Sequence, residues 1–332
     1  MEKVVLGRTG LEVPRLSLGG LFVSKVGAEF DDGKAAVLRA LEQGINYIDT
    51  APTYANSEEV LGKILKDVND EVILSTKLGG GMDDFNPQSK DCLQASFEKS
   101  LRLLEREKID ILMVHEPERP GAYDWWTDFL NVDGPVLEFC QELKEKGLVD
   151  HIGVGGTTAY EMAHLLNSGK FDVVLTAFQF NIMNREAVSS VFPAAKAHDT
   201  GVVIGSPLHQ GTYSMKFDAI YDDNVYWLNP IRRQQFKDLY ALADDCGLSV
   251  PQLAMRFAIF HDGVHTVLTG SRSVKEVDLN LAAFEAGPLS DDILDRLTKL
   301  ADRIPFRPAE EGTCLGWRLR APESYKGPQA VQ

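Results

Sequence analysis

Short apolar runs alternate with segments of helical periodicity along most of this chain. The apolar runs have the length and composition of strands buried on both faces; they cover residues 15–20, 45–49, 71–77, 109–115, 151–156, 171–178, 201–207 and 264–270. Amphipathic helical patterns lie between or after them, over residues 33–43, 57–66, 89–106, 135–146, 159–168, 186–198, 231–246 and 273–284. This alternation predicts a parallel sheet covered by helices, an α/β fold.

The number of strand–helix units distinguishes between two parallel-sheet folds. Eight units, with no GxGxxG after the first strand, favour a closed (β/α)8 TIM barrel over a doubly wound sheet. Before the barrel, residues 4–20 hold two short apolar runs around Thr9-Gly10, which predicts a β-hairpin that caps the barrel. With no linker or low-complexity tract, residues 1–332 are expected to form one domain with an irregular tail from about residue 302.

Two long segments interrupt the regular spacing of strands and helices. Residues 116–134 follow the fourth strand and residues 207–230 follow the seventh, and both are rich in aromatic and charged residues. Long irregular segments in a compact domain are usually functional. Because both follow strands directly, they are expected at the catalytic face of the barrel.

Composition and charge exclude several classes of function. A net charge of -15 argues against a nucleic-acid partner, and no run approaches the length of a membrane span. Charges at Glu2, Lys3 and Arg8 interrupt the first apolar runs, so no signal peptide is expected. The four cysteines have no ligand spacing and are expected to be reduced thiols in a cytoplasmic protein. Whether the chain forms oligomers stays open.

Four chemically active residues fall at or just after the carboxyl ends of predicted strands. Asp49 ends the second strand, Lys77 the third and His115 the fourth, and Tyr54 lies in the turn after Asp49. Barrel enzymes place their chemistry at these ends. Neighbouring parallel strands lie about 4.8 Å apart, so the four side chains are expected to share one pocket.

Together these four groups are suited to protonating an oxygen on which negative charge develops. Tyrosine has an ordinary pKa of about 10, which a neighbouring Lys77 cation would lower. Asp49 would compensate the buried ammonium, and His115 could donate a hydrogen bond to a carbonyl oxygen. Taken singly, a surface lysine, a packed tyrosine or a loop histidine would be the ordinary interpretation; the combination favours catalysis without a metal.

These residues lie in motifs that resemble those of the aldo-keto reductase family. The motifs are GINYIDTAPTYANSEEVLGKIL, VILSTKLG and IDILMVHEPE, and the resemblance continues through VLTGSRSVKEVDLNLAA. It implies a (β/α)8 barrel that binds a nicotinamide cofactor without a Rossmann domain and transfers hydride between cofactor and carbonyl. It further implies that Tyr54 is the acid/base, that Lys77 and Asp49 tune it, and that His115 orients the carbonyl.

The same resemblance implies a set of cofactor-binding residues. They are Gly155, Gly156, Gln179, Ser206, Pro207, Leu208, Gly270, Ser271, Arg272, Glu276 and Asn280. Arg272 could neutralise a 2′-phosphate and favours NADP(H), which is the cofactor expected here. Glu276 would repel that phosphate and accept a ribose hydroxyl, so NAD(H) stays open.

Two departures from the family pattern concern the nicotinamide. Gly205 stands where many members have an aromatic residue, and Gly155 and Gly156 replace a Ser-Asn pair that binds the carboxamide. Both are expected to open space there, and they are more similar to the sugar-dehydrogenase branch of the family.

The substrate is expected to be a small carbonyl compound, a sugar or a sugar derivative. Leu21, Glu116, Trp125 and Trp126 are the candidate substrate-binding residues, since tryptophan with carboxylates suits stacking on sugars and recognition of hydroxyls. Packing of these aromatic side chains onto the barrel is an equal alternative. Two other functions compete: a cofactor-binding redox sensor with little turnover, and a metal-dependent barrel enzyme that uses His115 with Glu116.

Overall fold

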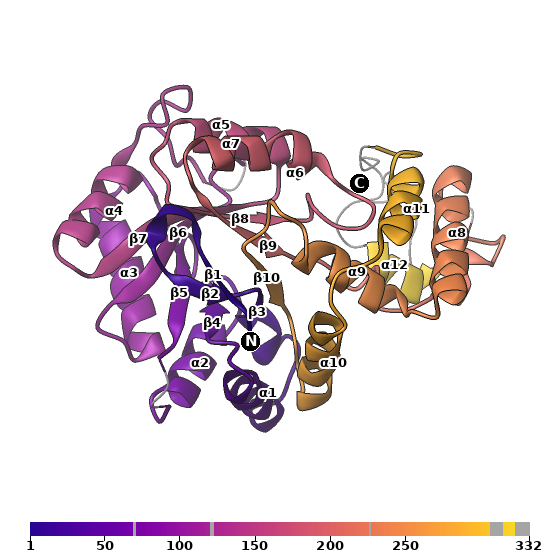
Figure 1. The fold of residues 1–332 in the computed structure, drawn as a ribbon. Helices are drawn as coiled ribbons and strands as arrows, with labels where there is room; N and C mark the ends of the chain where they lie inside the picture. The colour runs from indigo at the N-terminus through magenta and orange to yellow at the C-terminus, as the bar shows by residue number, and fades with distance from the viewer. Residues whose placement is uncertain (69–70, 120–122, 226, 306–314, 323–332) are drawn as a thin grey trace.

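A closed barrel of parallel strands forms the centre of the computed structural model, which describes residues 1–68, 71–119, 123–225, 227–305 and 315–322 (Figure 1). Its strands, in chain order, are β3 (Leu16–Gly19), β4 (Tyr47–Asp49), β5 (Ile73–Leu78), β6 (Ile109–His115), β7 (Val149–Gly156), β8 (Val173–Ala177), β9 (Gly201–Gly205) and β10 (Thr266–Thr269). Each pairs in parallel with the next, and β10 closes the ring onto β3. The predicted (β/α)8 barrel is therefore confirmed.

Helices pack on the outside of this barrel; α1 to α9 lie between its strands in the chain, and α10 to α12 follow the last strand (Figure 1). They are α1 (Phe30–Glu42), α2 (Ser57–Leu65), α3 (Lys90–Leu104), α4 (Pro135–Glu145), α5 (Ala159–Asn167), α6 (Glu186–Ser189), α7 (Val191–Ala197), α8 (Pro230–Cys246), α9 (Val250–Ile259), α10 (Val274–Glu285), α11 (Asp291–Ala301) and α12 (Leu315–Arg320). The single helix predicted over 186–198 is two helices, because the backbone leaves helical geometry at Ser190.

Two helices, α9 and α11, were not predicted by hydrophobic periodicity. Each begins with a capping residue that could have indicated it. Ser249 and Gln252 form a reciprocal capping box at the start of α9, and Ser290 accepts a hydrogen bond from the backbone of Ile293 at the start of α11. Serine followed by a glutamine three residues later is a recognisable helix start.

The predicted N-terminal hairpin closes the amino end of the barrel. Strands β1 (Lys3–Val5) and β2 (Glu12–Pro14) pair antiparallel. Leu6 and Val13 are fully buried and pack with barrel side chains that include Tyr47 and Ile111. The Arg8 N–H donates to the Asp199 carbonyl just before β9, at 2.6 Å. The hairpin therefore plugs the end of the barrel opposite the one where the strands terminate.

Part of the predicted irregular tail is helical. Residues 306–314 and 323–332 lie outside the described residues, but α12 stands between them. Its Arg320 donates from Nη2 to Ser214 Oγ at 3.2 Å, so α12 lies against the segment that follows β9. A short helix thus replaces irregular structure in this part of the tail.

Candidate active site

A buried ion pair joins β4 and β5 at the carboxyl end of the barrel. Lys77 Nζ donates to Asp49 Oδ2 at 2.7 Å and to the Thr50 carbonyl oxygen at 2.7 Å. Ser75 Oγ donates to the other carboxylate oxygen of Asp49 at 2.6 Å. Both charged side chains are almost fully buried, at 1% and 3% exposure. These hydrogen bonds fix the ammonium in place and offset the cost of removing it from water.

Tyr54 and His115 complete the group that the sequence predicted. Tyr54 lies in a tight turn after β4, where its N–H donates to the Ala51 carbonyl at 3.0 Å. Lys77 Nζ is 4.7 Å from the centre of the Tyr54 ring. The His115 ring meets the same phenol edge to face, with the ring centres 5.7 Å apart. The structure therefore brings the four side chains from β4, its following turn, β5 and β6 together.

Opposing effects set the pKa values of the phenol and the ammonium. Burial raises the pKa of Tyr54, and the charge and hydrogen bond of Lys77 only partly oppose this. The net pKa of Tyr54 is therefore raised in the protein without cofactor, and not lowered as the sequence suggested. Burial lowers the pKa of Lys77, but Asp49 and Tyr54 outweigh it, so the net pKa of Lys77 is raised and the ammonium keeps its proton.

His115 is a neutral imidazole at physiological pH. Burial, with the Lys77 charge as a smaller cause, lowers the pKa of His115 to about 3. Its Nδ1 lies 3.3 Å from Thr53 Oγ1. When the hydroxyl donates in this pair, the ring proton is on Nε2, which is then a hydrogen-bond donor. Thr53 was not among the residues expected from sequence, although it directly precedes Tyr54.

Three consecutive glycines line one wall of the site. Gly79, Gly80 and Gly81 have φ angles of 132°, 72° and 73°, a region that favours glycine. A β-carbon on Gly79 would lie 3.2 Å from that of His115, and one on Gly80 would lie 2.6 Å from the methyl group of Thr53. Bare backbone can therefore pass next to the catalytic residues. The three glycines that directly follow Leu78, the last residue of β5, indicate this feature in the sequence.

The two tryptophans expected at the substrate differ in their surroundings. Trp125 packs with Phe85 at 5.6 Å between ring centres and lies within reach of the backbone beside His115. Trp126 donates from Nε1 to the Pro117 carbonyl at 2.7 Å, and its ring packs edge-on against Phe171. Trp125 therefore lies beside the catalytic group, whereas Trp126 fastens its loop to the barrel.

The other two expected substrate residues also follow barrel strands. Leu21 is part of the 3₁₀ helix η2 (Gly20–Val23), directly after β3. Glu116 follows His115, and its carboxylate pairs with Arg119 at 2.9 Å. Its charge contributes to the raised pKa of Tyr54, after burial and Asp49.

The two glycines at the end of β7 differ in the space that they leave. A β-carbon on Gly155 would lie 3.4 Å from Lys77 Cε, so Gly155 offers bare backbone to the catalytic group. A β-carbon on Gly156 would overlap Met162 Sδ and lie 2.6 Å from the Glu118 carboxylate. Glu118 accepts from the Thr157 N–H at 2.6 Å and fills the place of the missing side chain. Its burial raises the pKa of Glu118. Glu118 was not among the residues expected from sequence.

The expected nicotinamide and pyrophosphate residues follow β8 and β9. Gln179 is buried and donates from Nε2 to the Thr157 carbonyl at 2.5 Å. Ser206 has a positive φ of 53° and begins the turn that continues through Pro207 and Leu208. Gln179 and Ser206 therefore follow the two strands after β7, in which Gly155 leaves bare backbone beside Lys77.

The expected adenosine-end residues lie after β10. Gly270 and Ser271 lead into α10, and Asn280 Nδ2 donates to Ser271 Oγ at 3.0 Å. Arg272 is paired with Glu276, with 2.6 Å between Nη2 and Oε1. The residues expected to bind cofactor therefore lie at the end of β7 or after β8, β9 and β10, which are neighbouring strands of the barrel.

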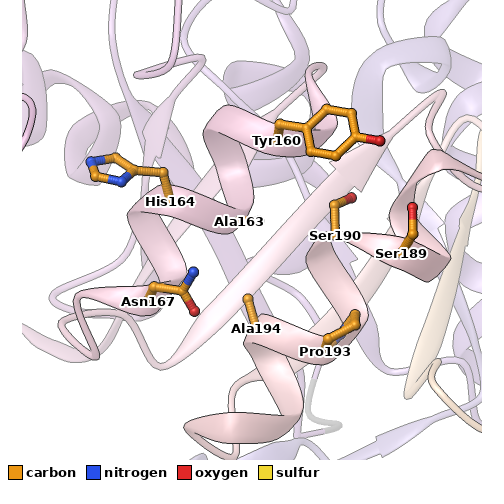
Figure 2. Close-up of a pocket in the computed structure, with 8 residues that line it drawn as sticks. All are labelled: Tyr160, Ala163, His164, Asn167, Ser189, Ser190, Pro193 and Ala194. Atoms are coloured by element: carbon orange, nitrogen blue, oxygen red, sulfur yellow. The ribbon is translucent and has the colours of Figure 1, made fainter.

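A separate surface pocket lies outside the barrel, between α5 and the pair α6 and α7 (Figure 2). Its lining residues are Tyr160, Ala163, His164, Asn167, Ser189, Ser190, Pro193 and Ala194. None of the four catalytic candidates takes part in it. Within the described ranges, no group of three or more potential metal ligands comes together, and no helix is long and apolar enough to span a membrane.

The closed barrel and this group of side chains define a class of oxidoreductase that uses a nicotinamide cofactor. The model of the aldo/keto reductase family matches residues 15–302. The chain therefore belongs to the aldo/keto reductase family, and it is an NAD(P)-dependent oxidoreductase.

Named relatives include dehydrogenases and channel subunits. An L-galactose dehydrogenase of Arabidopsis thaliana is 28% identical, across 85% of this chain and 88% of the relative. A D-threo-aldose 1-dehydrogenase of a Pseudomonas species is 26% identical, across 82% of this chain and 89% of the relative. A probable voltage-gated potassium channel subunit beta of Arabidopsis thaliana is 23% identical, across 93% and 99%.

Proposed function

We propose that this protein catalyses reversible hydride transfer between a nicotinamide dinucleotide and the carbonyl carbon of a sugar or sugar-derived substrate. The observation that carries the proposal is the convergence of Tyr54, Lys77, Asp49 and His115 on one place at the carboxyl end of the barrel. The relatives that are named as sugar dehydrogenases support the substrate class.

Each member of the group has a distinct part in the proposed reaction. The bound nicotinamide supplies or accepts the hydride. Tyr54 gives its proton to the carbonyl oxygen as negative charge develops there, and it takes that proton back in the reverse direction. Lys77 stabilises the resulting tyrosinate, and Asp49 fixes Lys77. The neutral His115 donates from Nε2 to the same oxygen, which polarises and orients the carbonyl group.

Replacement of the phenol by phenyl tests this assignment. Tyr54→Phe removes the acid and keeps the ring, so turnover of aldoses and uronates should fall by about 10²–10⁴-fold. The affinity for the cofactor, measured by the quenching of protein fluorescence, should change by less than about threefold. The reason is that the Tyr54 hydroxyl acts on the substrate and not on the cofactor. Ser206→Ala, on the cofactor side, is the control that keeps the acid intact.

Two results would contradict the proposal. Equal loss of turnover and of cofactor binding in Tyr54→Phe would show that the phenol does not act as the acid. Turnover of hydrophobic aldehydes alone, with no aldose or uronate accepted, would remove the sugar from the proposed substrate class.

A cofactor-binding regulatory protein is the second candidate function. The relatives named as potassium channel beta subunits favour it. Tight binding of the dinucleotide with no turnover on a broad carbonyl panel would support this function. The raised pKa of Lys77, which keeps the ammonium charged beside the phenol, favours the enzyme.

A further inference from the structure

A carboxylate of the protein binds two nitrogens of the Arg272 guanidinium. Nη2 of this residue donates to Glu276 Oε1 at 2.6 Å, and Nε donates to the same oxygen at 3.1 Å. The backbone N–H of Arg272 donates to Glu276 Oε2 at 2.8 Å. The guanidinium is therefore held by two of its nitrogens, and its charge is balanced within the protein.

One N–H of the first turn of α10 has an internal side-chain acceptor as well. Ser273 is the N-cap, and its Oγ accepts from the Glu276 N–H at 3.4 Å. The free N–H groups of a helix start are the usual place for a phosphate. At this helix start the anion is the Glu276 carboxylate. Burial opposes its ionisation, but Arg272 outweighs burial, so the pKa of Glu276 is lowered and the carboxylate stays charged.

We propose that the Arg272–Glu276 pair makes this protein selective for NAD(H) over NADP(H). The inference rests on the proposed function, in which the adenosine end of the cofactor lies at this loop. A 2′-phosphate would meet the Glu276 carboxylate and an arginine whose charge is already paired with that carboxylate, which costs binding. A ribose hydroxyl can instead donate to Glu276. The arginine that suggested NADP(H) in the sequence is thus withdrawn from that role by its contact with Glu276.

A fluorescence titration of the complete protein with NADH and with NADPH tests the selectivity without any turnover. NADH should bind at least about tenfold more tightly than NADPH. Glu276→Gln removes the charge and keeps the size of the side chain. In this variant the affinity for NADPH should rise by about tenfold, and the affinity for NADH should change by less than about threefold.

A control variant separates this local effect from the overall charge. Asp278→Asn removes one negative charge from the same helix, where Asp278 pairs with Arg39 at 2.8 Å. The ratio of the two affinities should stay within about twofold of the wild-type value in this variant. Arg272→Ala combined with Glu276→Gln should lose the gained NADPH affinity, because the freed guanidinium is the group that binds the phosphate.

The other outcomes of these titrations would contradict the inference. Equal or tighter binding of NADPH by the wild type would overturn the inference, as would an unchanged ratio in Glu276→Gln, and both would leave the proposed hydride transfer standing. Binding of neither dinucleotide would overturn the proposed function and the inference together.

Discussion

A buried lysine that keeps its proton is the residue on which the catalytic group depends. Lys77 is 1% exposed, and Asp49 is the carboxylate that pairs with it. Removing one partner of a buried ion pair leaves a charge without compensation and typically costs about 3–5 kcal/mol. Asp49 is therefore expected to support the fold, and in the proposed reaction the same contact with Lys77 tunes Tyr54.

The protonation of His115 gives a prediction at the residue scale. Its pKa is lowered to about 3 in the folded protein by burial and Lys77, against about 6.5 in the unfolded chain. As the pH falls, the unfolded chain takes up this proton first. The stability that depends on neutral His115 is therefore complete above about pH 6.5 and is lost progressively as the pH falls toward 3.

Urea unfolding at pH 7 and pH 5 measures this dependence. Between these values the contribution of His115 should fall by about 2 kcal/mol. His115→Asn has no group that titrates there, so its loss of stability should be smaller by that amount. Identical losses in the variant and the wild type would mean that His115 titrates normally in the fold.

Single residues also show what sequence could and could not predict. Asp49, Lys77 and His115 could be placed together because each ends a strand, and the order of strands in a barrel follows the chain. The roles of Thr53 and Glu118 could not, because each depends on a contact with a residue far along the chain. The sign of the pKa shift of Tyr54 depends on how deeply the phenol is buried, which sequence does not give.

At the scale of elements, strand β7 separates two functions on its two faces. Successive residues of a strand point to opposite sides. Gly155 faces Lys77 inside the barrel, and Gly156 faces Met162 of α5 outside it. The inner face thus leaves room beside the catalytic group, and the outer face allows α5 and the Glu118 carboxylate to pack closely on the strand.

Alanine substitutions at these two glycines should have different costs. Gly156→Ala introduces a methyl group that overlaps Met162 and Glu118, so it should destabilise the protein by about 1–3 kcal/mol. Gly155→Ala is the matched control; its methyl group would lie 3.4 Å from Lys77 Cε, an ordinary contact, and should cost less than about 1 kcal/mol. Chemical unfolding of both variants measures these losses of stability. Equal losses in the two variants would contradict the assignment of Gly155 and Gly156 to different faces of β7.

The accuracy of the predicted elements varied for a physical reason. The strands were well predicted because burial on both faces leaves a continuous apolar run. The expected helix over 186–198 became α6 and α7, since periodicity does not register one residue that leaves helical geometry. Helix α9 carries its signal in the capping residues Ser249 and Gln252, and not in its hydrophobic pattern alone.

At the scale of the whole molecule, the N-terminal hairpin and the candidate catalytic group lie at opposite ends of the barrel. The hairpin packs Leu6 and Val13 onto the amino end. The catalytic group lies at the carboxyl end, and the side chains of the barrel interior separate the two. Activity and stability should therefore be affected by substitutions at different ends of the barrel.

Leu6→Ala tests this separation. It removes a fully buried side chain from the hairpin and should destabilise the protein by about 2–5 kcal/mol. At a temperature where the variant is folded, its kcat and KM should stay within about twofold of the wild type, because the cavity lies far from Tyr54. A proportional loss of kcat would show that the hairpin end is coupled to the chemistry.

The N-terminal hairpin determines from which end of the barrel a molecule can reach the candidate catalytic residues. Leu6 and Val13 close one end of the barrel, and packed side chains fill its interior. A molecule therefore cannot pass through the barrel from one end to the other. Whatever arrives at the catalytic residues must depart through the same mouth. In the proposed reaction, substrate binding and product release would therefore use the same opening of the barrel. The next substrate would bind only after the last product has left.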